Sequence, residues 1–422
     1  MVIGGGIHGA GIAQAAAAGG FSVLVLEQHG LASGTSSRSS KLIHGGLRYL
    51  ESGQMALVRE CLHERELLLK LAPGLVHLQP FYIPIYSNTM RRPAQLRVGL
   101  SLYALLGGMD KAARFRRVPG SEWGSLDGLE TRDLEAVFQY WDGQTDDAAL
   151  TRAVMRSAQD LGAHLQMPAN FTGAHLDAEG CRVAYQYNGQ NHTCQATVLV
   201  NAAGPWVNQV LDRIAPAPAQ LDVELVQGTH LVVAGTITRG IYYVEAPQDQ
   251  RAVFVMPWQG NTLVGTTETL YQGDPAAVQP LPQEQEYLMQ TLAHYFPAYR
   301  HSPVVLSAFA GLRVLPGRSR HPEPLASLSR AVHGGTSVAR GRMPEAADTS
   351  ASMHVMGESK AFSHPRDTVL HVDRQERPRL LTIYGGKLTA YRSTAERVMQ
   401  RLATTLPSRT TRADTRTLIL PV

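Results

Sequence analysis

The chain has 422 residues, 44% of them hydrophobic and 18% charged, an ordinary composition for a globular protein of about two or three domain units. A formal net charge of +4 is small for this length, so it gives no reason to expect a nucleic-acid partner, although it suits anionic small molecules. Cys61, Cys181 and Cys194 form no C-x-x-C pair, so neither a disulfide framework nor a metal site is expected, and a reducing cytoplasm is favoured.

The first motif of the chain is rich in glycine. Gly4, Gly6 and Gly9 fit the dinucleotide-binding pattern G-x-G-x-x-G, in which glycines permit a tight turn, a close approach to pyrophosphate and close packing of a helix. The alanine-rich residues 7–18 predict that helix. A short buried strand then leads to Glu27, where a carboxylate can accept hydrogen bonds from ribose hydroxyls.

The middle of the chain changes from helices to strands. An amphipathic helix is expected at residues 55–71, and Asp146 and Asp147 predict the cap of a second helix, over residues 148–161. Asn188-Gly189 predicts a hairpin turn. Strands are expected at residues 163–167, 181–187, 192–196, 198–200, 223–226, 230–233, 241–244, 252–256 and 262–265.

The C-terminal part returns to the first fold. A strand at 304–309 is expected to lead back to the nucleotide-binding region, and a strand at 380–384 precedes the last helix, at 388–402. Residues 317–366 are rich in Pro, Ser, Gly and Arg without periodicity, which predicts a long surface insertion.

These segments predict an α/β fold in which a Rossmann-like nucleotide-binding domain carries an inserted, mostly antiparallel β-sheet substrate domain. We assign residues 1–80, 140–220 and 304–406 to the first domain, and residues 81–139 and 221–303 to the second. The apolar run at 98–109 is shorter than the roughly 20 residues that a spanning helix needs, and no secretory signal opens the chain, so we expect no membrane crossing.

In this order, the segments resemble the FAD-dependent glycerol-3-phosphate dehydrogenase family, within the glycine-oxidase and D-amino-acid-oxidase-like flavoproteins. The motifs that carry the resemblance are residues 4–11, 35–51 (TSSRSSKLIHGGLRYLE), 201–206 (NAAGPW), 265–274 (GTTETLYQGD), 311–313 (GLR) and 384–392 (YGGKLTAYR). The resemblance implies non-covalently bound FAD and the oxidation of sn-glycerol 3-phosphate to dihydroxyacetone phosphate by hydride transfer to the flavin. The inserted stretch and the absence of an appended helical C-terminal domain depart from the family pattern.

The resemblance also implies residue roles. Arg48, Tyr49, Arg313 and Lys387 match positions that contact the phosphate or the reacting end of the substrate, although each cation has a structural alternative. Gly385 and Gly386 are expected to open the last helix toward the flavin. The expected cofactor-binding residues are Gly4, Gly6, Gly9, Glu27, Thr35, Ser36, Ser40, Lys41, Leu42, His44, Gly45, Gly46, Ala203, Gly204, Trp206, Gly385, Gly386, Lys387, Leu388 and Thr389.

The catalytic proton acceptor has two candidates. His230 resembles the position of the family's base, and an imidazole with a pKa near about 6.5 is neutral often enough to serve. His44 lies in the flavin motif and is the rival, because it can equally touch the flavin ring. Arg313 is the third residue that we place at the catalytic centre.

Partners and rival functions stay open. Residues 91–117 combine basic side chains with an apolar run, which favours equally a helix lying on an anionic membrane surface and a helix packed between domains. The first alternative predicts a peripheral position on the cytoplasmic face of the inner membrane, with quinone as the electron acceptor. Two other functions compete with the first: an amine or amino-acid oxidase of the same fold that uses oxygen, and a flavin-binding protein without turnover.

Overall fold

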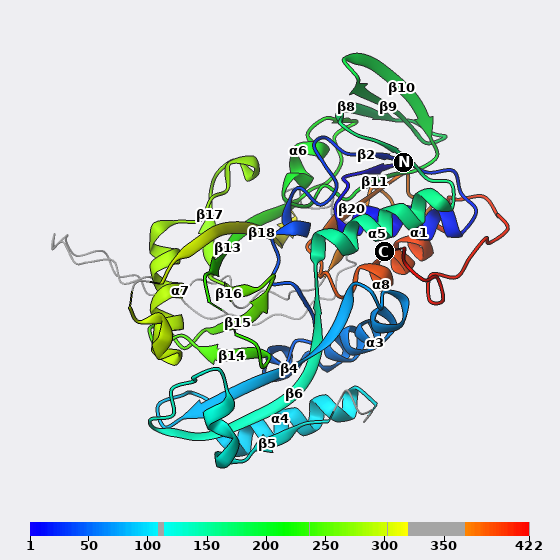
Figure 1. Cartoon of the computed structure of the whole chain (residues 1–422). Helices are drawn as coiled ribbons and strands as arrows, with labels where there is room; N and C mark the ends of the chain where they lie inside the picture. Colours follow the sequence, from blue (N-terminus) through cyan, green and yellow to red (C-terminus); the bar gives the residue numbers. More distant parts are fainter. Residues whose placement is uncertain (109–113, 236, 302, 320–367, 422) are drawn as a thin grey trace, which may run out of the picture.

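The computed structural model describes residues 1–108, 114–235, 237–301, 303–319 and 368–421 (Figure 1). From residue 320 to its end, the predicted insertion lies outside the described residues. The described part is an α/β fold, as the sequence predicts, and its strands form three β-sheets.

The first sheet is the expected nucleotide-binding sheet. It has six strands among the described residues, in the order β19 (Val369–Val372), β20 (Leu380–Tyr384), β11 (Leu199–Asn201), β1 (Val2–Ile3), β2 (Leu24–Leu26) and β7 (His164–Gln166). Every neighbouring pair is parallel except β19 with β20. The carboxyl ends of β1 and β11 therefore lie side by side, and such ends are where α/β sheets bind ligands.

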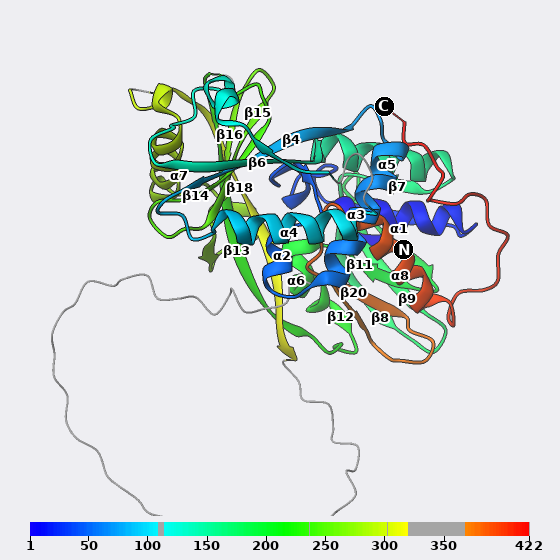
Figure 2. The ribbon, with the colours of Figure 1, turned by 90° about the horizontal axis from the view of Figure 1, so that it is seen from below.

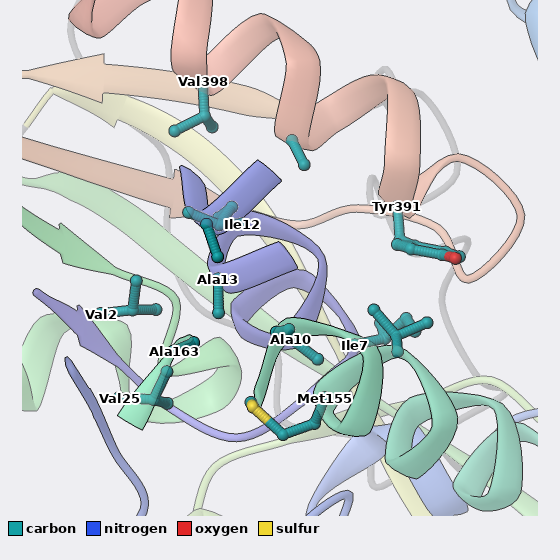
Figure 3. Close-up of a cluster of buried hydrophobic side chains, with 14 of the residues drawn as sticks. Val2, Ile7, Ala10, Ile12, Ala13, Val25, Met155, Ala163, Tyr391 and Val398 are labelled. Atoms are coloured by element: carbon teal, nitrogen blue, oxygen red, sulfur yellow. The ribbon is translucent and has the colours of Figure 1, made fainter. Parts of the chain in front are cut away.

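Both faces of this sheet are covered, because successive strand residues point to opposite sides. Val2 joins a core with helices α1 (Ile7–Ala18), α5 (Asp147–Asp160) and α8 (Tyr391–Leu402), and Figure 3 shows Ile7 and Ala10 of α1 close to Met155 of α5. Ile3 joins a second core, with the hairpin sheet on the other face. That sheet has the order β10 (Gln190–Ala196), β9 (Cys181–Tyr187), β8 (Ala169–Leu176) and β12 (Ile214–Ala215).

The third sheet is the largest in the described chain and is mostly antiparallel. Eight strands follow the order β17 (Thr269–Tyr271), β13 (Leu221–Val233), β16 (Asn261–Gly265), β15 (Ala252–Trp258), β14 (Ile241–Glu245), β4 (Val76–Tyr86), β6 (Leu134–Thr145) and β3 (Leu42–Ile43). Off this path, β18 (Val305–Ser319) pairs with β13, and β5 (Arg116–Val118) pairs with β6.

Helices cover both faces of this sheet as well. α7 (Pro282–Tyr295) packs on one face through Leu288 and Leu292. On the other face lie α3 (Met55–Leu71) and α4 (Pro93–Leu106), on the same side of the long strands β4 and β6 (Figure 2). The two remaining α-helices in the described ranges are short, α2 (Arg48–Glu51) and α6 (Val207–Leu211). No helix of the described chain is both long and apolar enough to span a bilayer.

Several predicted elements are confirmed because their signals are local. The helix at 55–71 has its predicted bounds. The Asp146 side chain accepts a hydrogen bond from the Ala149 amide at 2.8 Å, as an N-cap should. Asn188 and Gly189 both have positive φ values, +50° and +75°, which a tight hairpin turn requires.

Three expectations were wrong in detail. The last helix begins at Tyr391 rather than at 388, because residues 387–390 form a turn in which the Ala390 amide donates to the Lys387 carbonyl oxygen at 3.2 Å. Gly385 and Gly386, with φ of +72° and +120°, precede this turn and do not open the helix. The strand expected to lead back from 304 to the nucleotide-binding sheet is β18, which instead runs along β13 in the largest sheet. Residues 221–233 form the single strand β13 instead of two strands. The division into two domains stays a prediction.

Candidate active site

A cavity of about 670 Å³ lies between the nucleotide-binding sheet and the largest sheet. Seventeen of the twenty residues expected to bind the cofactor line it, namely Gly4, Gly6, Glu27, Thr35, Ser36, Ser40, Leu42, His44, Gly46, Ala203, Gly204, Trp206, Gly385, Gly386, Lys387, Leu388 and Thr389. The expected substrate and catalytic residues Arg48, Tyr49, His230 and Arg313 line it as well. Tertiary structure thus brings together motifs from both ends of the chain.

One wall of the cavity is made largely of backbone. Gly4 has a φ of +105°, and a Cβ atom at this position would lie 2.6 Å from the carbonyl oxygen of Ala202. A Cβ atom on Gly386 would collide with Nε2 of His8. Only glycine therefore lets β1, β11 and the 385–386 turn approach one another, and this cradle fits a dinucleotide that is bound through backbone amides.

Glu27 and Ser36 fix the start of α1 beside this wall. The Glu27 carboxylate accepts hydrogen bonds from the amides of Gly5, at 2.6 Å, and His29, at 2.7 Å. The Ser36 hydroxyl accepts one from the amide of Ile7, at 2.9 Å. The positive end of the helix dipole thus lies at the cavity, where a pyrophosphate is stabilised.

His230 lies on the opposite wall, on β13. Its Nε2 is 2.9 Å from the Ser40 hydroxyl, and its ring stacks on Phe309 with the ring centroids 5.0 Å apart. Burial, and secondarily Lys41 and Arg313, lower the pKa of His230 to about 3. The imidazole is therefore neutral at cellular pH, and with so low a pKa it is a weak base in this cofactor-free state.

His44 has a similar protonation state in a different setting. Its backbone amide donates to the Thr389 hydroxyl at 3.2 Å, and its ring meets Phe254 edge-on. Burial is the main cause that lowers the pKa of His44, so this imidazole is neutral as well. Protonation alone consequently does not separate the two candidates.

Cations gather at the substrate side of the cavity. The Lys387 ammonium is buried with no hydrogen-bond partner among the described residues, and it lies 4.1 Å from the centre of the Tyr49 ring. The Arg313 guanidinium is bonded to the Glu268 carboxylate, with Nη1 2.5 Å from Oε1. Arg48 also lines this region, at the start of α2. A buried ammonium without a partner is costly, which points to an anionic ligand.

Three residues expected at the cofactor do not line the cavity. The Lys41 ammonium lies 2.5 Å from Oδ1 of Asp147 and 2.6 Å from the carbonyl oxygen of Ser37, so it ties the 37–41 loop to α5. A Cβ atom on Gly9 would collide with the carbonyl oxygen of Gly4, which fits a role in helix packing. The third residue, Gly45, lies just behind the cavity wall.

Sequence reasoning missed other residues of the cavity. Glu268 stands inside the 265–274 motif, and His8 occupies a variable position of the glycine pattern, so their motifs gave a signal. Asn170, Phe171 and Arg213 also line the cavity, but nothing local in the sequence marks them. Asn170 and Phe171 lie in β8 of the hairpin sheet, and Arg213 directly precedes its strand β12.

Arg91 forms ion pairs within the protein, which the basic pattern of residues 91–117 did not predict. Its guanidinium contacts Glu51 of α2 at 2.6 Å and Glu245 of β14 at 2.5 Å, and it lies over the ring of Tyr243. The short helix that carries Arg48 and Tyr49 is thereby attached to the largest sheet.

Comparisons with known proteins agree with this geometry. The family described as DAO, FAD dependent oxidoreductase, matches residues 1–392. D-erythritol 1-phosphate dehydrogenase of Brucella abortus is 34% identical over 420 residues, covering 96% of this chain and 74% of that protein. Glycerol-3-phosphate dehydrogenase of Pseudomonas aeruginosa is 35% identical over 411 residues, covering 95% and 70%.

A solved structure is similar over the same range. It is the glycerol-3-phosphate dehydrogenase from Bacillus halodurans complexed with FAD, at 25% identity and a TM-score of 0.67. The match covers 99% of this chain but 66% of that one, so this chain spans about two thirds of the length of its solved relative. Taken with the glycine cradle, these similarities show that the chain belongs to the FAD-dependent oxidoreductase family, in the group that contains the glycerol-3-phosphate dehydrogenases.

Proposed function

We propose that this FAD-dependent dehydrogenase oxidises sn-glycerol 3-phosphate to dihydroxyacetone phosphate by hydride transfer to the flavin, and that its electrons pass to quinone. The observation that carries the proposal is the buried Lys387 ammonium, which has no hydrogen-bond partner in the described chain and lies against the ring of Tyr49 in the cavity. An alcohol phosphate supplies the missing negative charge.

The charges lining the cavity favour a dianion. Arg48, Arg313 and Lys387 stand near its substrate side, while Glu268 is the carboxylate that partly neutralises Arg313. A guanidinium binds phosphate through two parallel hydrogen bonds, which fixes both its position and its orientation. A carboxylate substrate carries one charge and needs one such cation, so this set favours a phosphate over an amino acid.

In this proposal the substrate hydroxyl proton goes to an imidazole of the chain. His230 is the favoured acceptor because its neutral ring already contacts a hydroxyl, that of Ser40, at 2.9 Å. His44 remains the rival, and comparing the His230→Asn and His44→Asn variants in single-turnover reduction distinguishes them. The true acceptor is the one whose loss slows reduction by about a hundredfold or more.

FAD supplies the two-electron acceptor when it is bound. Gly4, Gly6 and the start of α1 would hold its pyrophosphate, and Glu27 its adenosine ribose. The 44–46 and 385–389 segments would hold the ring system. We propose non-covalent binding, so acid precipitation should leave all the flavin in solution.

A second substrate deserves equal testing, because D-erythritol 1-phosphate dehydrogenase is among the most similar relatives. Both substrates present a phosphate and an oxidisable hydroxyl, and they differ in chain length. The decisive experiment adds glycerol 3-phosphate, D-erythritol 1-phosphate, glycine or proline to the oxidised enzyme without oxygen and follows flavin absorbance. Bleaching by a polyol phosphate supports the proposal. Bleaching by an amino acid alone supports an amino-acid oxidase, and no bleaching supports a protein without turnover.

The quinone acceptor implies contact with a membrane surface, and we propose residues 91–117 for that contact, on the cytoplasmic face of the inner membrane. Residues 109–113 of this range lie outside the described residues. The outward face of α4 exposes Val98 and Leu105, which are 69% and 61% accessible. Arg91 is engaged in ion pairs, so Arg97 is a better candidate for lipid contact. Val98→Glu combined with Leu105→Glu should abolish flotation with vesicles containing anionic lipid while substrate-driven flavin reduction persists.

A further inference from the structure

A buried polar network lies behind the cavity wall at residues 44–46. The Gly45 amide donates to the Tyr103 hydroxyl at 2.8 Å, and that hydroxyl donates to Oδ2 of Asp142 at 2.5 Å. Nη1 of Arg65 donates to the other carboxylate oxygen of Asp142, at 2.7 Å. Four segments of the chain, the 44–46 turn, α4, β6 and α3, are thereby joined.

All the side chains of this network are buried. The side chains of Arg65 and Asp142 are 0% and 1% accessible, and Tyr103 is 2% accessible. Burial, and next Asp142, raise the pKa of Tyr103 well above its usual value, so the phenol keeps its proton and remains a donor. Burying such groups costs free energy, which pairing between them offsets, and paired networks can hold a single arrangement of the surrounding backbone.

The packing at Gly45 allows little movement toward these side chains. A Cβ atom at this position would lie 2.6 Å from the Tyr103 hydroxyl and 2.7 Å from Cδ2 of Leu62. The neighbouring residues His44 and Gly46 line the cavity, whereas Gly45 faces away from it. A shift of the Gly45 amide would therefore move both neighbours at the cavity wall.

We propose that Tyr103, oriented by Asp142 and Arg65, is a positioning residue for the flavin: by holding the Gly45 amide it fixes His44 and Gly46 against the cofactor. This inference rests on the proposed placement of residues 44–46 at the flavin. The buried face of α4, which carries Tyr103, would position the flavin, whereas the exposed face of the helix is the one proposed for membrane contact. This role does not depend on which substrate the enzyme oxidises.

The test compares Tyr103→Phe with Tyr242→Phe. Tyr242 is a matched control because it is 0% accessible, donates to the Asp127 carboxylate at 2.9 Å, and does not line the cavity. We expect Tyr103→Phe to release FAD from the holoenzyme about tenfold faster or more and to shift the visible flavin spectrum. Tyr242→Phe should change only the melting temperature.

Hydrogen exchange of the peptide containing Gly45 provides a second measurement that needs no turnover. In the protein as purified, the Gly45 amide should be protected, and Tyr103→Phe should accelerate its exchange while Tyr242→Phe does not. An unprotected Gly45 amide in the folded wild-type protein would overturn the inference, even if the variant fails to fold. So would wild-type FAD release and spectrum in a folded Tyr103→Phe protein. A wild-type protein that binds FAD but fails to oxidise polyol phosphates refutes the proposed substrate and leaves this inference standing.

Discussion

The two walls of the cavity are built in different ways. The wall on the nucleotide-binding sheet is made largely of backbone. It includes the 202–204 turn, and an added carbon atom has no room at Gly4 or Gly386. The wall on the largest sheet is made of side chains, with His230 and Arg313 facing the same space. Adding atoms at the first wall should therefore impair FAD binding. Removing side-chain atoms at the second wall should impair the use of the substrate.

The largest expected effect is at Gly9, which does not line the cavity but packs directly against Gly4 of the backbone wall. Gly9→Ala should abolish FAD binding and destabilise the fold by about 1–3 kcal/mol or more, because the new Cβ atom collides with the Gly4 carbonyl oxygen. Flavin content after purification and urea unfolding measure both effects. Gly99→Ala in α4 is the control, since no atom lies within 4 Å of its Cβ position, and helix propensity should raise its stability by up to about 1 kcal/mol. Equal flavin content in Gly9→Ala and Gly99→Ala would show that FAD binding does not depend on the close packing of backbone at Gly9.

Truncation of the cationic side chains at the substrate side of the cavity, Arg313 on the largest sheet and Lys387 after β20, should spare the cofactor and impair the substrate. Arg313→Ala and Lys387→Ala should each lower the rate of substrate-driven flavin reduction by roughly tenfold to a hundredfold, because each charge-assisted bond is worth about 1.5–3 kcal/mol. Arg313→Ala also removes the ion pair with Glu268, whose carboxylate lines the same cavity. Stopped-flow absorbance measures the rate, with Arg117→Ala as a control outside the cavity. Unchanged kinetics in both variants would remove these residues from the site.

The pH dependence of stability tests the burial of His230. Its pKa in the folded protein is about 3, below the ordinary 6.5, so the unfolded chain binds a proton that the folded chain excludes. Its contribution to stability is complete above about pH 6.5 and is lost as the pH falls toward 3, by up to about 1.4 kcal/mol per pH unit. His230→Asn should reduce that slope by one proton in urea titrations of the cofactor-free protein. Equal slopes for variant and wild type would contradict the burial.

The smallest effect is expected at α2, which the ion pairs of Arg91 attach to the largest sheet. Glu51→Gln weakens the contact with Arg91 that holds Arg48 and Tyr49 in place. Because the Glu51 side chain is 55% accessible, the change should be at most about 1 kcal/mol, a rise in KM below roughly fivefold with kcat unchanged. Asp160→Asn, which breaks the exposed pair with Arg156, is the control, and equal KM values in the two variants would argue against the attachment.

The sequence predicted correctly those features that depend on local signals. Glycine spacing, the Asp146 cap and the Asn188-Gly189 turn each act within a few residues of the chain. Lys41 shows the limit of such signals, since its motif suggested a cofactor contact and its ammonium instead reaches Asp147, which lies far along the chain.

By itself, the sequence determined the α/β character and the glycine turn before α1, and most of the site residues that it marked do line the cavity. These follow from backbone preferences and from motifs that keep their own geometry. Only the tertiary structure decided that β18 pairs with β13, that Arg91 holds α2, and that Tyr103 lies behind Gly45. Each of these joins residues that are distant in sequence, and such contacts are selected by the packing of whole faces, which no local pattern encodes.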